Sequence, residues 1–478
     1  MKLTLSIATA AALAGIAPGA WAFDSGSTGA DGAFNATVNT QVPLPPSGVL
    51  NYTTFNVAAG VTVTFGKNAT NTPVVILASG DVTIAGTIDL NGTGGTATGT
   101  AGDGQLGDDG QPGIGGPGGF DGGRGGQPAG NTRGGNGLGP GGGGGGLGSG
   151  APNGQLSGYG GAGAGFSSAG GAGTDGSNGG ASYGSDTLLP LVGGSGGGGG
   201  RAGIYAGAGG GGGGGAILIA SSGTVNMTGT IRANAGAGGG TAGSPYGCGG
   251  PGGGGSGGAI RILATRVAGN GTIQANGAGY QTTCWQGAGN GAPGRIRIEA
   301  EIMNRTAATS PAFFFSDTPT TVFVAGLPTL RIARVGGFDV PEAPVGEVDV
   351  TLPVDFPNPV TVEFATTGVP VGNTVALKVV PAQGNAVNAI SGALAGTTDS
   401  AAASVQVNIP GGPSVLQAST TYNIVVAQGE ALSRYAQGER VEKVRLEAAL
   451  GTAPMVTLIT VSGREFTLPA TSVPGFGG

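Results

Sequence analysis

The sequence contains no histidine, only two cysteines and few charged residues, and each shortage excludes a class of function. Without imidazole there is no serine–histidine or cysteine–histidine catalysis, no zinc site built on histidine, and no histidine-based proton transfer near neutral pH. Charged residues make up 9% of the chain, against about a quarter of an average globular domain. We therefore expect stability to come mainly from backbone hydrogen bonds and apolar contacts. We expect a protein that is not an enzyme, with no bound metal or cofactor.

Positive charge is too sparse for nucleic acid. The formal net charge is −6 and the isoelectric point is about 4.7. Phosphate binding depends on clustered lysine and arginine, and the sequence contains no basic stripe. We expect no nucleic-acid partner.

Long apolar runs are also missing after the N-terminus. The apolar run from Leu3 to Ala17 follows a lysine and precedes Ala20-Trp21-Ala22, which places small residues at the two positions that a signal peptidase reads. Residues 1–22 are therefore predicted to be a secretory signal peptide. No later stretch supplies the roughly 20 apolar residues needed to cross a bilayer. We expect a secreted or cell-surface protein without a transmembrane segment once the signal is removed.

Glycine is present in large excess, at 111 of 478 residues, and in the segment 92–215 it often recurs at every third position. The longest such series consists of Gly104, Gly107, Gly110, Gly113, Gly116, Gly119, Gly122 and Gly125. An extended helix with three residues per turn presents every third residue on one edge, and that edge approaches a neighbouring backbone closely only without a Cβ. The period predicts short extended runs, folded back and forth into a bundle held by backbone N–H to C=O bonds.

Two other interpretations fit a glycine-rich segment. A collagen triple helix needs three chains and is usually rich in proline, whereas this segment contains little proline. A flexible, disordered glycine linker is the second alternative. The regular spacing favours the bundle.

The sequence on either side of the glycine-rich segment repeats one unit. V-I-L-A-S-G-D-V-T-I-A-G-T-I-D-L-N ends at Asn91, I-L-I-A-S-S-G-T-V-N-M-T-G-T-I-R-A-N ends at Asn234, and I-R-I-L-A-T-R-V-A-G-N-G-T-I-Q-A-N ends at Asn276. A fourth copy begins at Arg295. Units of this kind stack as the rungs of a solenoid. We expect a parallel β-helix domain over 52–305, with glycine-rich excursions that leave from one corner.

Equivalent positions in these units predict two structural ladders. The ladders consist of Ile88, Ile231 and Ile273, and of Asn91, Asn234 and Asn276. The isoleucines form an apolar column, and the asparagines mark a turn, because asparagine tolerates left-handed backbone and hydrogen-bonds its own neighbours. Neither ladder is expected to be catalytic.

Two further regions flank the solenoid. Residues 23–51 are rich in small and turn-forming residues, and we expect a loosely ordered leader or a cap. From 306 to 478 glycine becomes scarcer and seven to nine alternating strand-length segments follow, separated by turn residues. That pattern is typical of an immunoglobulin-like β-sandwich, so the fold class is all-β throughout.

The two cysteines occupy equivalent places in successive excursions. Cys248 lies twelve residues before Ile260, and Cys284 lies twelve residues before Ile296. An exported chain with cysteines in this arrangement is expected to oxidise them. The predicted Cys248–Cys284 disulfide would stabilise the fold by roughly 3 to 4 kcal/mol.

Three resemblances follow from these motifs. The G-V-T-V and G-T-I-x-A-N units resemble rungs of secreted right-handed parallel β-helix proteins of the pectin-lyase-like kind, over about 52–300 without the excursions. Those enzymes place Asp, Arg and Lys on an outer strand face, whereas this chain has Thr, Asn and Ala there, so no catalytic residue is carried over. The glycine period is similar to the polyglycine II-type bundles of snow flea antifreeze protein and of bacteriophage tail-fibre adhesin tips. The start F-D-S-G-S-T-G-A-D-G-A-F-N resembles glycine-rich exported proteins of Gram-negative bacteria, which implies an envelope location.

Three functions are consistent with these features. The first is a structural or adhesive surface protein whose glycine-rich bundle contacts a surface polysaccharide or copies of itself. The second is ice binding by an array of small polar side chains. The third is a carbohydrate-active enzyme that binds calcium, for which the acidic candidates are Asp103, Asp108, Asp109 and Asp121.

Overall fold

The computed structural model is almost entirely β-structure. It describes residues 23–97, 110–128, 132–147, 158–174, 176–203, 205–240, 248–281, 287–320, 322, 328–340, 350–353, 355–381, 386–412, 414–424, 426–449 and 452–469. The helices among these residues are α1 (Val426–Leu432) and a single 3-10 turn, η1 (Ser433–Tyr435).

The first half of the chain forms two parallel sheets. Sheet A has nine strands: β1 (Ala33–Ala36), β3 (Val49–Tyr52), β4 (Thr54–Val57), β6 (Val74–Ala78), β7 (Val82–Ile84), β9 (Ala216–Met227), β11 (Ala259–Ala268), β13 (Arg295–Met303) and β14 (Phe313–Ser316). Sheet B has five strands: β2 (Thr40–Pro43), β5 (Thr62–Gly66), β8 (Thr87–Asp89), β10 (Thr230–Arg232) and β12 (Thr272–Gln274).

The strands of sheet B stack in the register that the sequence units predict. Ile88 pairs with Ile231, and Ile231 pairs with Ile273, in parallel. Neighbouring side chains of a strand point to opposite faces. The isoleucine of each strand points inward, into the apolar core between sheets A and B, and the residues on either side of it point outward. Strand β6 is buried on both faces, since Val74 and Ile76 join this core while its alternate residues pack into a second apolar cluster outside sheet A.

Strands begin at Ala33, well before Tyr52, where the alternating sequence pattern first predicts one. Phe34 stacks on Phe55, and Ala36 and Val42 are buried in the core, so β1 and β2 are rungs of the two parallel sheets rather than a loosely ordered leader. Glycine, serine and proline between these short strands hide their alternation in the sequence. Residues 23–32 form no strand, and the hydroxyls of Ser25 and Ser27 donate to the carbonyl oxygens of Ala78 and Tyr52, the last residues of β6 and β3.

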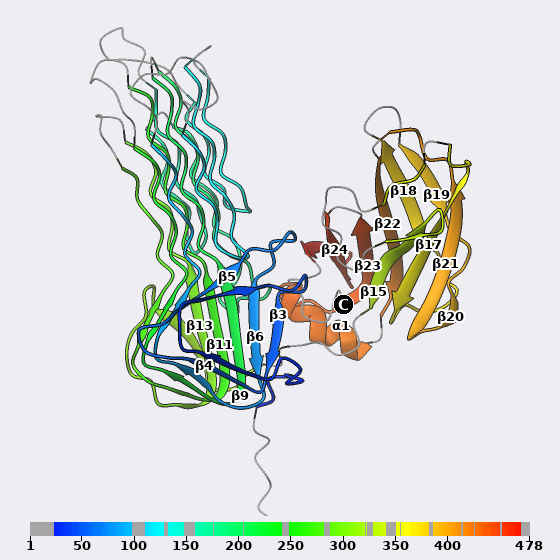
Figure 1. The fold of residues 1–478 in the computed structure, drawn as a ribbon, viewed down its shortest axis with the longest axis horizontal. Coiled ribbons are helices and arrows are strands. Elements are labelled where there is room, and N and C mark those ends of the chain that lie inside the picture. Colours follow the sequence, from blue (N-terminus) through cyan, green and yellow to red (C-terminus); the bar gives the residue numbers. More distant parts are fainter. Residues whose placement is uncertain are drawn as a thin grey trace, which may run out of the picture.

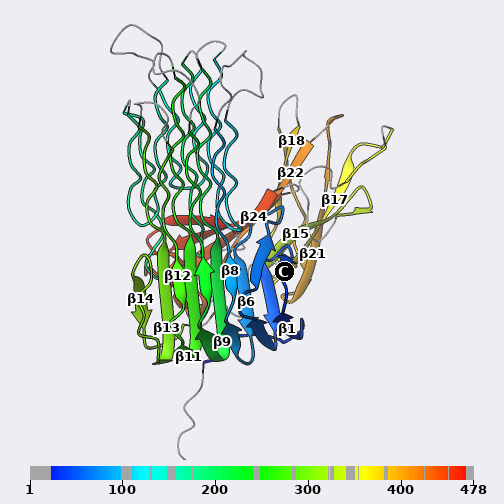
Figure 2. The same cartoon turned by 60° about the vertical axis from the view of Figure 1, so that its left-hand side comes forward.

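The glycine-rich excursions all leave between sheet B and sheet A. They connect β8 to β9, β10 to β11, and β12 to β13. Figures 1 and 2 show the resulting extended runs rising side by side from one end of the parallel sheets. This common exit positions the runs for contact with one another.

The C-terminal part contains two antiparallel sheets. Sheet C has five strands: β15 (Thr329–Val335), β16 (Phe338–Asp339), β17 (Val360–Thr367), β20 (Ala395–Thr397) and β21 (Ser400–Val407). Sheet D has six strands: β18 (Ala376–Pro381), β19 (Val387–Ile390), β22 (Ser414–Asn423), β23 (Val441–Ala449), β24 (Thr452–Thr460) and β25 (Glu465–Pro469).

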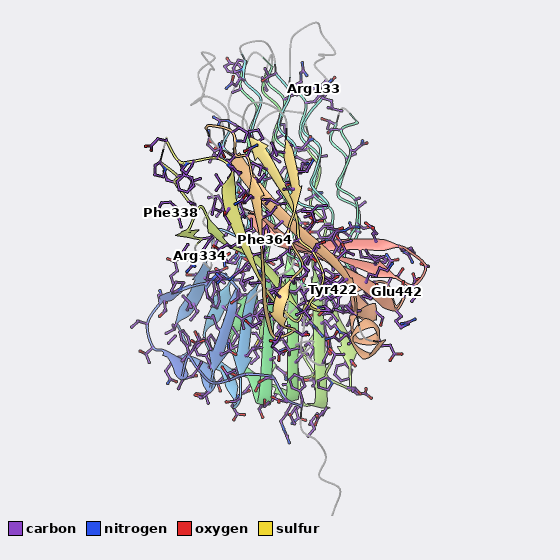
Figure 3. All side chains as sticks on the ribbon, turned by 90° about the vertical axis from the view of Figure 1, so that its right-hand side faces the viewer. Arg133, Arg334, Phe338, Phe364, Tyr422 and Glu442 are labelled. Atoms are coloured by element: carbon purple, nitrogen blue, oxygen red, sulfur yellow. The ribbon has the colours of Figure 1, made fainter. Side chains whose placement is uncertain are left out.

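One apolar core joins sheets C and D. It includes Phe364 from β17, Tyr422 from β22 and Leu432 from α1, and Figure 3 labels the first two within this part of the molecule. Leu189, from the glycine-rich half of the chain, also belongs to this core. The two halves of the molecule therefore share a packed contact.

Candidate functional site

The glycine-rich bundle is the feature from which we build the candidate site. We define it as the described residues of 92–97, 110–128, 132–147, 158–174, 176–181, 193–203, 205–215, 233–240, 248–258, 275–281 and 287–294. Neighbouring runs are joined by backbone hydrogen bonds at every third residue. Gly110, Gly113 and Gly116 donate to the carbonyl oxygens of Gly207, Gly210 and Gly213 at 2.9, 2.8 and 3.0 Å.

The run 207–215 lies at the centre of the bundle. Each of its N–H groups donates to, and each of its carbonyl groups accepts from, another run or an adjoining strand. Successive N–H groups along the run donate in turn to three different neighbours, the runs 120–126, 250–256 and 90–96, and the order then repeats. Its carbonyl groups accept mainly from 110–116, 194–200 and 236–239. A backbone bonded on all sides in this way leaves no polar group of the central run unpaired.

Glycine is required at the closest contacts between runs, although Ala208 is accommodated in the central run. A Cβ built on Gly210 would lie 2.0 Å from the carbonyl oxygen of Gly197, and one built on Gly211 would lie 2.0 Å from that of Gly236. Ordinary contact begins at 3.4 Å. The absence of a Cβ, rather than a positive φ angle, is what these positions require.

The longest glycine series does not continue as one extended run. The chain reverses at Gly118, where φ is +75°. After the reversal Gly122 and Gly125 donate to the carbonyl oxygens of Gly113 and Gly110, so the second half lies against the first. The described glycines of the series are Gly110, Gly113, Gly116, Gly119, Gly122 and Gly125, whereas Gly104 and Gly107 lie outside the described residues.

A small polar cluster fixes the base of the bundle. The Tyr183 hydroxyl donates to the carbonyl oxygen of Gly193 at 2.5 Å and accepts from the Ser195 hydroxyl at 3.0 Å. The backbone N–H of Ser195 in turn donates to Ser256 Oγ at 2.8 Å. Burial raises the pKa of the Tyr183 hydroxyl, so it stays protonated and serves as a hydrogen-bond donor.

The asparagine ladder links successive rungs. The N–H of Asn234 donates to Asn91 Oδ1, and the N–H of Asn276 donates to Asn234 Oδ1, both at 2.8 Å. None of the three asparagines has a positive φ angle. The ladder therefore does not use left-handed backbone. The Asn91 and Asn234 side chains each accept the N–H of the next rung, and Asn276 Oδ1 accepts from the Ser310 hydroxyl at 2.7 Å.

The sequence motifs missed one buried charged cluster, on the outer side of sheet A. Glu299 Oε1 accepts from Arg261 at 2.7 and 3.0 Å and from Arg297 Nε at 2.8 Å, and Oε2 accepts from the N–H and hydroxyl of Thr320 at 2.8 and 2.9 Å. The Arg261 side chain is 1% exposed and that of Glu299 is fully buried. The sequence did contain a signal for this cluster, because Arg261, Arg297 and Glu299 are charged residues within otherwise apolar strand units.

This cluster is structural rather than catalytic. Burial by itself raises the pKa of the Glu299 carboxyl, but the charge of Arg261 and the surrounding hydrogen bonds outweigh it and hold the pKa below its ordinary value. Both carboxylate oxygens already accept hydrogen bonds from protein groups. A fully bonded, ionised carboxylate of this kind is a poor general acid or base.

The remaining acidic candidates do not form a site among the described residues. Asp121 Oδ1 accepts from Lys67 Nζ at 2.9 Å and from the N–H of Gly115 at 2.7 Å. Asp89, a further acidic residue on sheet B, pairs with Arg232 at 3.1 Å. Asp103, Asp108 and Asp109 lie outside the described residues. Within the part of the chain that the structure describes, no group of three or more His, Cys, Asp or Glu side chains is placed to hold a metal ion.

Cys248 is buried and disulfide-bonded. Cys284 lies outside the described residues, so its pairing with Cys248 stays a prediction. Cys248 therefore has no free thiol.

Helices of the described residues are too short or too polar to cross a bilayer. Comparison with protein-family models, with curated proteins and with solved structures finds no match to this chain.

Proposed function

We propose that this is an exported structural or adhesive surface protein that displays the glycine-rich bundle for contact with a surface polysaccharide, a matrix or copies of itself. The observation that carries the proposal is the central run 207–215, whose backbone groups are hydrogen-bonded in every direction. Such a bundle keeps its shape without a conventional apolar core. A rigid projection suits display better than a flexible linker does.

In this proposal the parallel sheets form a β-helix and the glycine runs a polyglycine II-type bundle. The shared core between sheets A and B and the parallel pairing of successive units support the first assignment. Hydrogen bonds at every third residue support the second. We further propose that sheets C and D are an immunoglobulin-like sandwich that attaches the molecule to the Gram-negative envelope.

Contact by the bundle is favoured over catalysis because each charged candidate site among the described residues is already engaged. Glu299 is saturated by hydrogen bonds, and Asp89 and Asp121 are each paired with a basic residue. Exposed apolar side chains occur on the bundle instead, at Ile114 and Leu138. These features fit a surface that binds without chemistry.

The test is a variant that shortens the bundle and keeps every strand of the four sheets, although it removes Leu189 from the core of sheets C and D. The N–H of Gly209 donates to the carbonyl oxygen of Thr96 at 3.1 Å, so a short glycine–serine turn can replace residues 97–208 without separating β8 from β9. Binding of the mature chain to isolated envelopes and to a polysaccharide panel is then compared between the two proteins, after circular dichroism has shown that the variant folds. Loss of binding is expected, and equal binding by the shortened chain would rule the proposal out.

A threonine column on sheet B favours ice binding as a second candidate function. Thr62, Thr87, Thr230 and Thr272 are aligned on adjacent strands by the parallel register. Strand spacing repeats their hydroxyls about every 4.8 Å, which suits ordered water. Thermal hysteresis of the mature chain and of Thr230→Lys tests this candidate. Activity that is lost in the variant supports it, and zero hysteresis at millimolar concentration removes it.

A further inference from the structure

Sheet A ends in an open aromatic edge at β14. This strand pairs with β13 on one side, and among the described residues no strand pairs with its other side. Phe313 and Phe315 continue the inward columns of Ile296 and Ile298, and no strand of the described residues lies beyond them. Phe314 is 41% exposed and Phe315 is 47% exposed. Figure 2 shows β14 at the edge of the parallel sheets opposite β1.

Strands β14, β13, β11, β9, β6 and β3 are neighbours in this order, and the end opposite to β14 is closed. There β3 is the last strand, and Asp31 binds its free edge at Asn51. The N–H of Asp31 donates to the carbonyl oxygen of Asn51 at 2.8 Å, and Asp31 Oδ2 accepts from the N–H of Asn51 at 2.6 Å. A second copy therefore cannot stack its β14 on β3 without displacing Asp31.

We propose that β14 is a dimer interface, in which the β14 strands of two copies pair antiparallel about a two-fold axis at Phe314. An isologous contact uses the same patch on both copies, so it needs only the end that is open. In this register Phe314 faces Phe314 of the second copy, and Phe313 faces Phe315. Monomeric proteins usually protect such edges with charge or proline. The four residues of β14, F-F-F-S, include neither, and the flanking Pro311 and Asp317 lie outside the strand. No like charges meet across the axis.

The geometry also sets the direction of the two bundles. The run 287–294 enters β13 at its N-terminal end, and β13 is parallel to β14, so each bundle extends beyond the N-terminal ends of these strands. Antiparallel pairing reverses the strands of the second copy. The dimer consequently points its two bundles to opposite sides, whatever partner the bundles bind.

The experiment is sedimentation velocity of the mature full-length chain over a range of concentrations. Wild type is compared with Phe314→Lys, with Phe314→Glu and with an equimolar mixture of the two variants. Val38→Lys, at a 69% exposed residue near the other end of the sheets, is the matched control. Circular dichroism shows whether each variant is folded.

A wild-type dimer is expected to dissociate in each single Phe314 variant, with a dissociation constant raised at least about 100-fold by the loss of two buried rings and by like charges face to face. The mixture restores the dimer because lysine then faces glutamate, and Val38→Lys leaves the dimer intact. A wild type that stays monomeric at all concentrations overturns the proposal. A dimer unaffected by Phe314→Lys, or an open-ended oligomer broken by Val38→Lys, overturns it equally. If the lysine and glutamate variants do not fold, Phe314→Cys replaces them. Symmetric Phe314 contacts then predict an intermolecular disulfide, and its absence refutes the two-fold register.

Discussion

Replacing Gly211 by alanine tests the close packing of the bundle directly. The new Cβ would lie 2.0 Å from the carbonyl oxygen of Gly236, where ordinary contact begins at 3.4 Å, so the two runs must separate by up to about 1.4 Å. The bonds that join these runs, from Gly236 N–H to Gly212 and from Gly239 N–H to Gly209, are both 2.8 Å long. Losing the two bonds in a buried setting costs about 2 to 4 kcal/mol.

Hydrogen exchange measured by mass spectrometry isolates this effect from the rest of the molecule. A loss of about 2 to 4 kcal/mol corresponds to exchange that is about 30 to 1,000 times faster at the amides of Gly236 and Gly239, which donate the two bonds, so peptides that cover 236–239 report the effect. The matched control is Gly279→Ala, a bundle position where the nearest atom to the new Cβ is Asn290 Oδ1 at 3.3 Å, on a side chain that can move. The control should change exchange by less than about tenfold. Exchange in Gly211→Ala that matches the control would refute the close-packed bundle.

Three other changes have expected outcomes. Asn234→Ala removes the acceptor of the Asn276 N–H and should lower the free energy of unfolding by about 1 to 2 kcal/mol in denaturant titrations, while no loss would mean that the ladder is not stabilising. Glu299→Gln leaves Arg261 buried without its counter-charge and should cost about 3 to 5 kcal/mol near neutral pH. Because the folded-state pKa of Glu299 lies below its unfolded value, wild type loses this advantage as the pH falls through the folded pKa. The difference in free energy of unfolding between the two proteins should therefore narrow as the pH falls through the folded-state pKa of Glu299, and a difference that is constant with pH would contradict the assignment. Reduction of the disulfide at Cys248 should lower stability by about 3 to 4 kcal/mol, measured by unfolding with and without reductant, and equal unfolding curves would show that the crosslink has no stabilising role.

The stacking of the parallel strands was accessible from the sequence because it rests on a period. Ile88, Ile231 and Ile273 occupy the same place in three copies of one unit, and parallel pairing puts such residues side by side. The exit of all excursions between sheet B and sheet A follows from the same alignment. Because the unit repeats, contacts between residues far apart in the sequence can be predicted by aligning the copies.

Features that occur once were not accessible in this way. The reversal at Gly118 lies inside an unbroken glycine period, so the spacing that predicts hydrogen bonds gives no sign of the turn. The strands that begin at Ala33 have only one short alternation each. The pairing of Arg261 with Glu299 joins adjacent rungs through side chains whose partners depend on the packed structure.

The hydrogen-bond partners of the central run repeat every three residues, and this repeat restricts how the length of the bundle can change. Residues three apart bond to the same neighbouring run, as Gly207, Gly210 and Gly213 do to 120–126. Insertion or deletion of three residues on two facing runs preserves every partnership, whereas a change of one or two residues rotates each donor toward the wrong neighbour. The length of the bundle can therefore change only in steps of three residues per run.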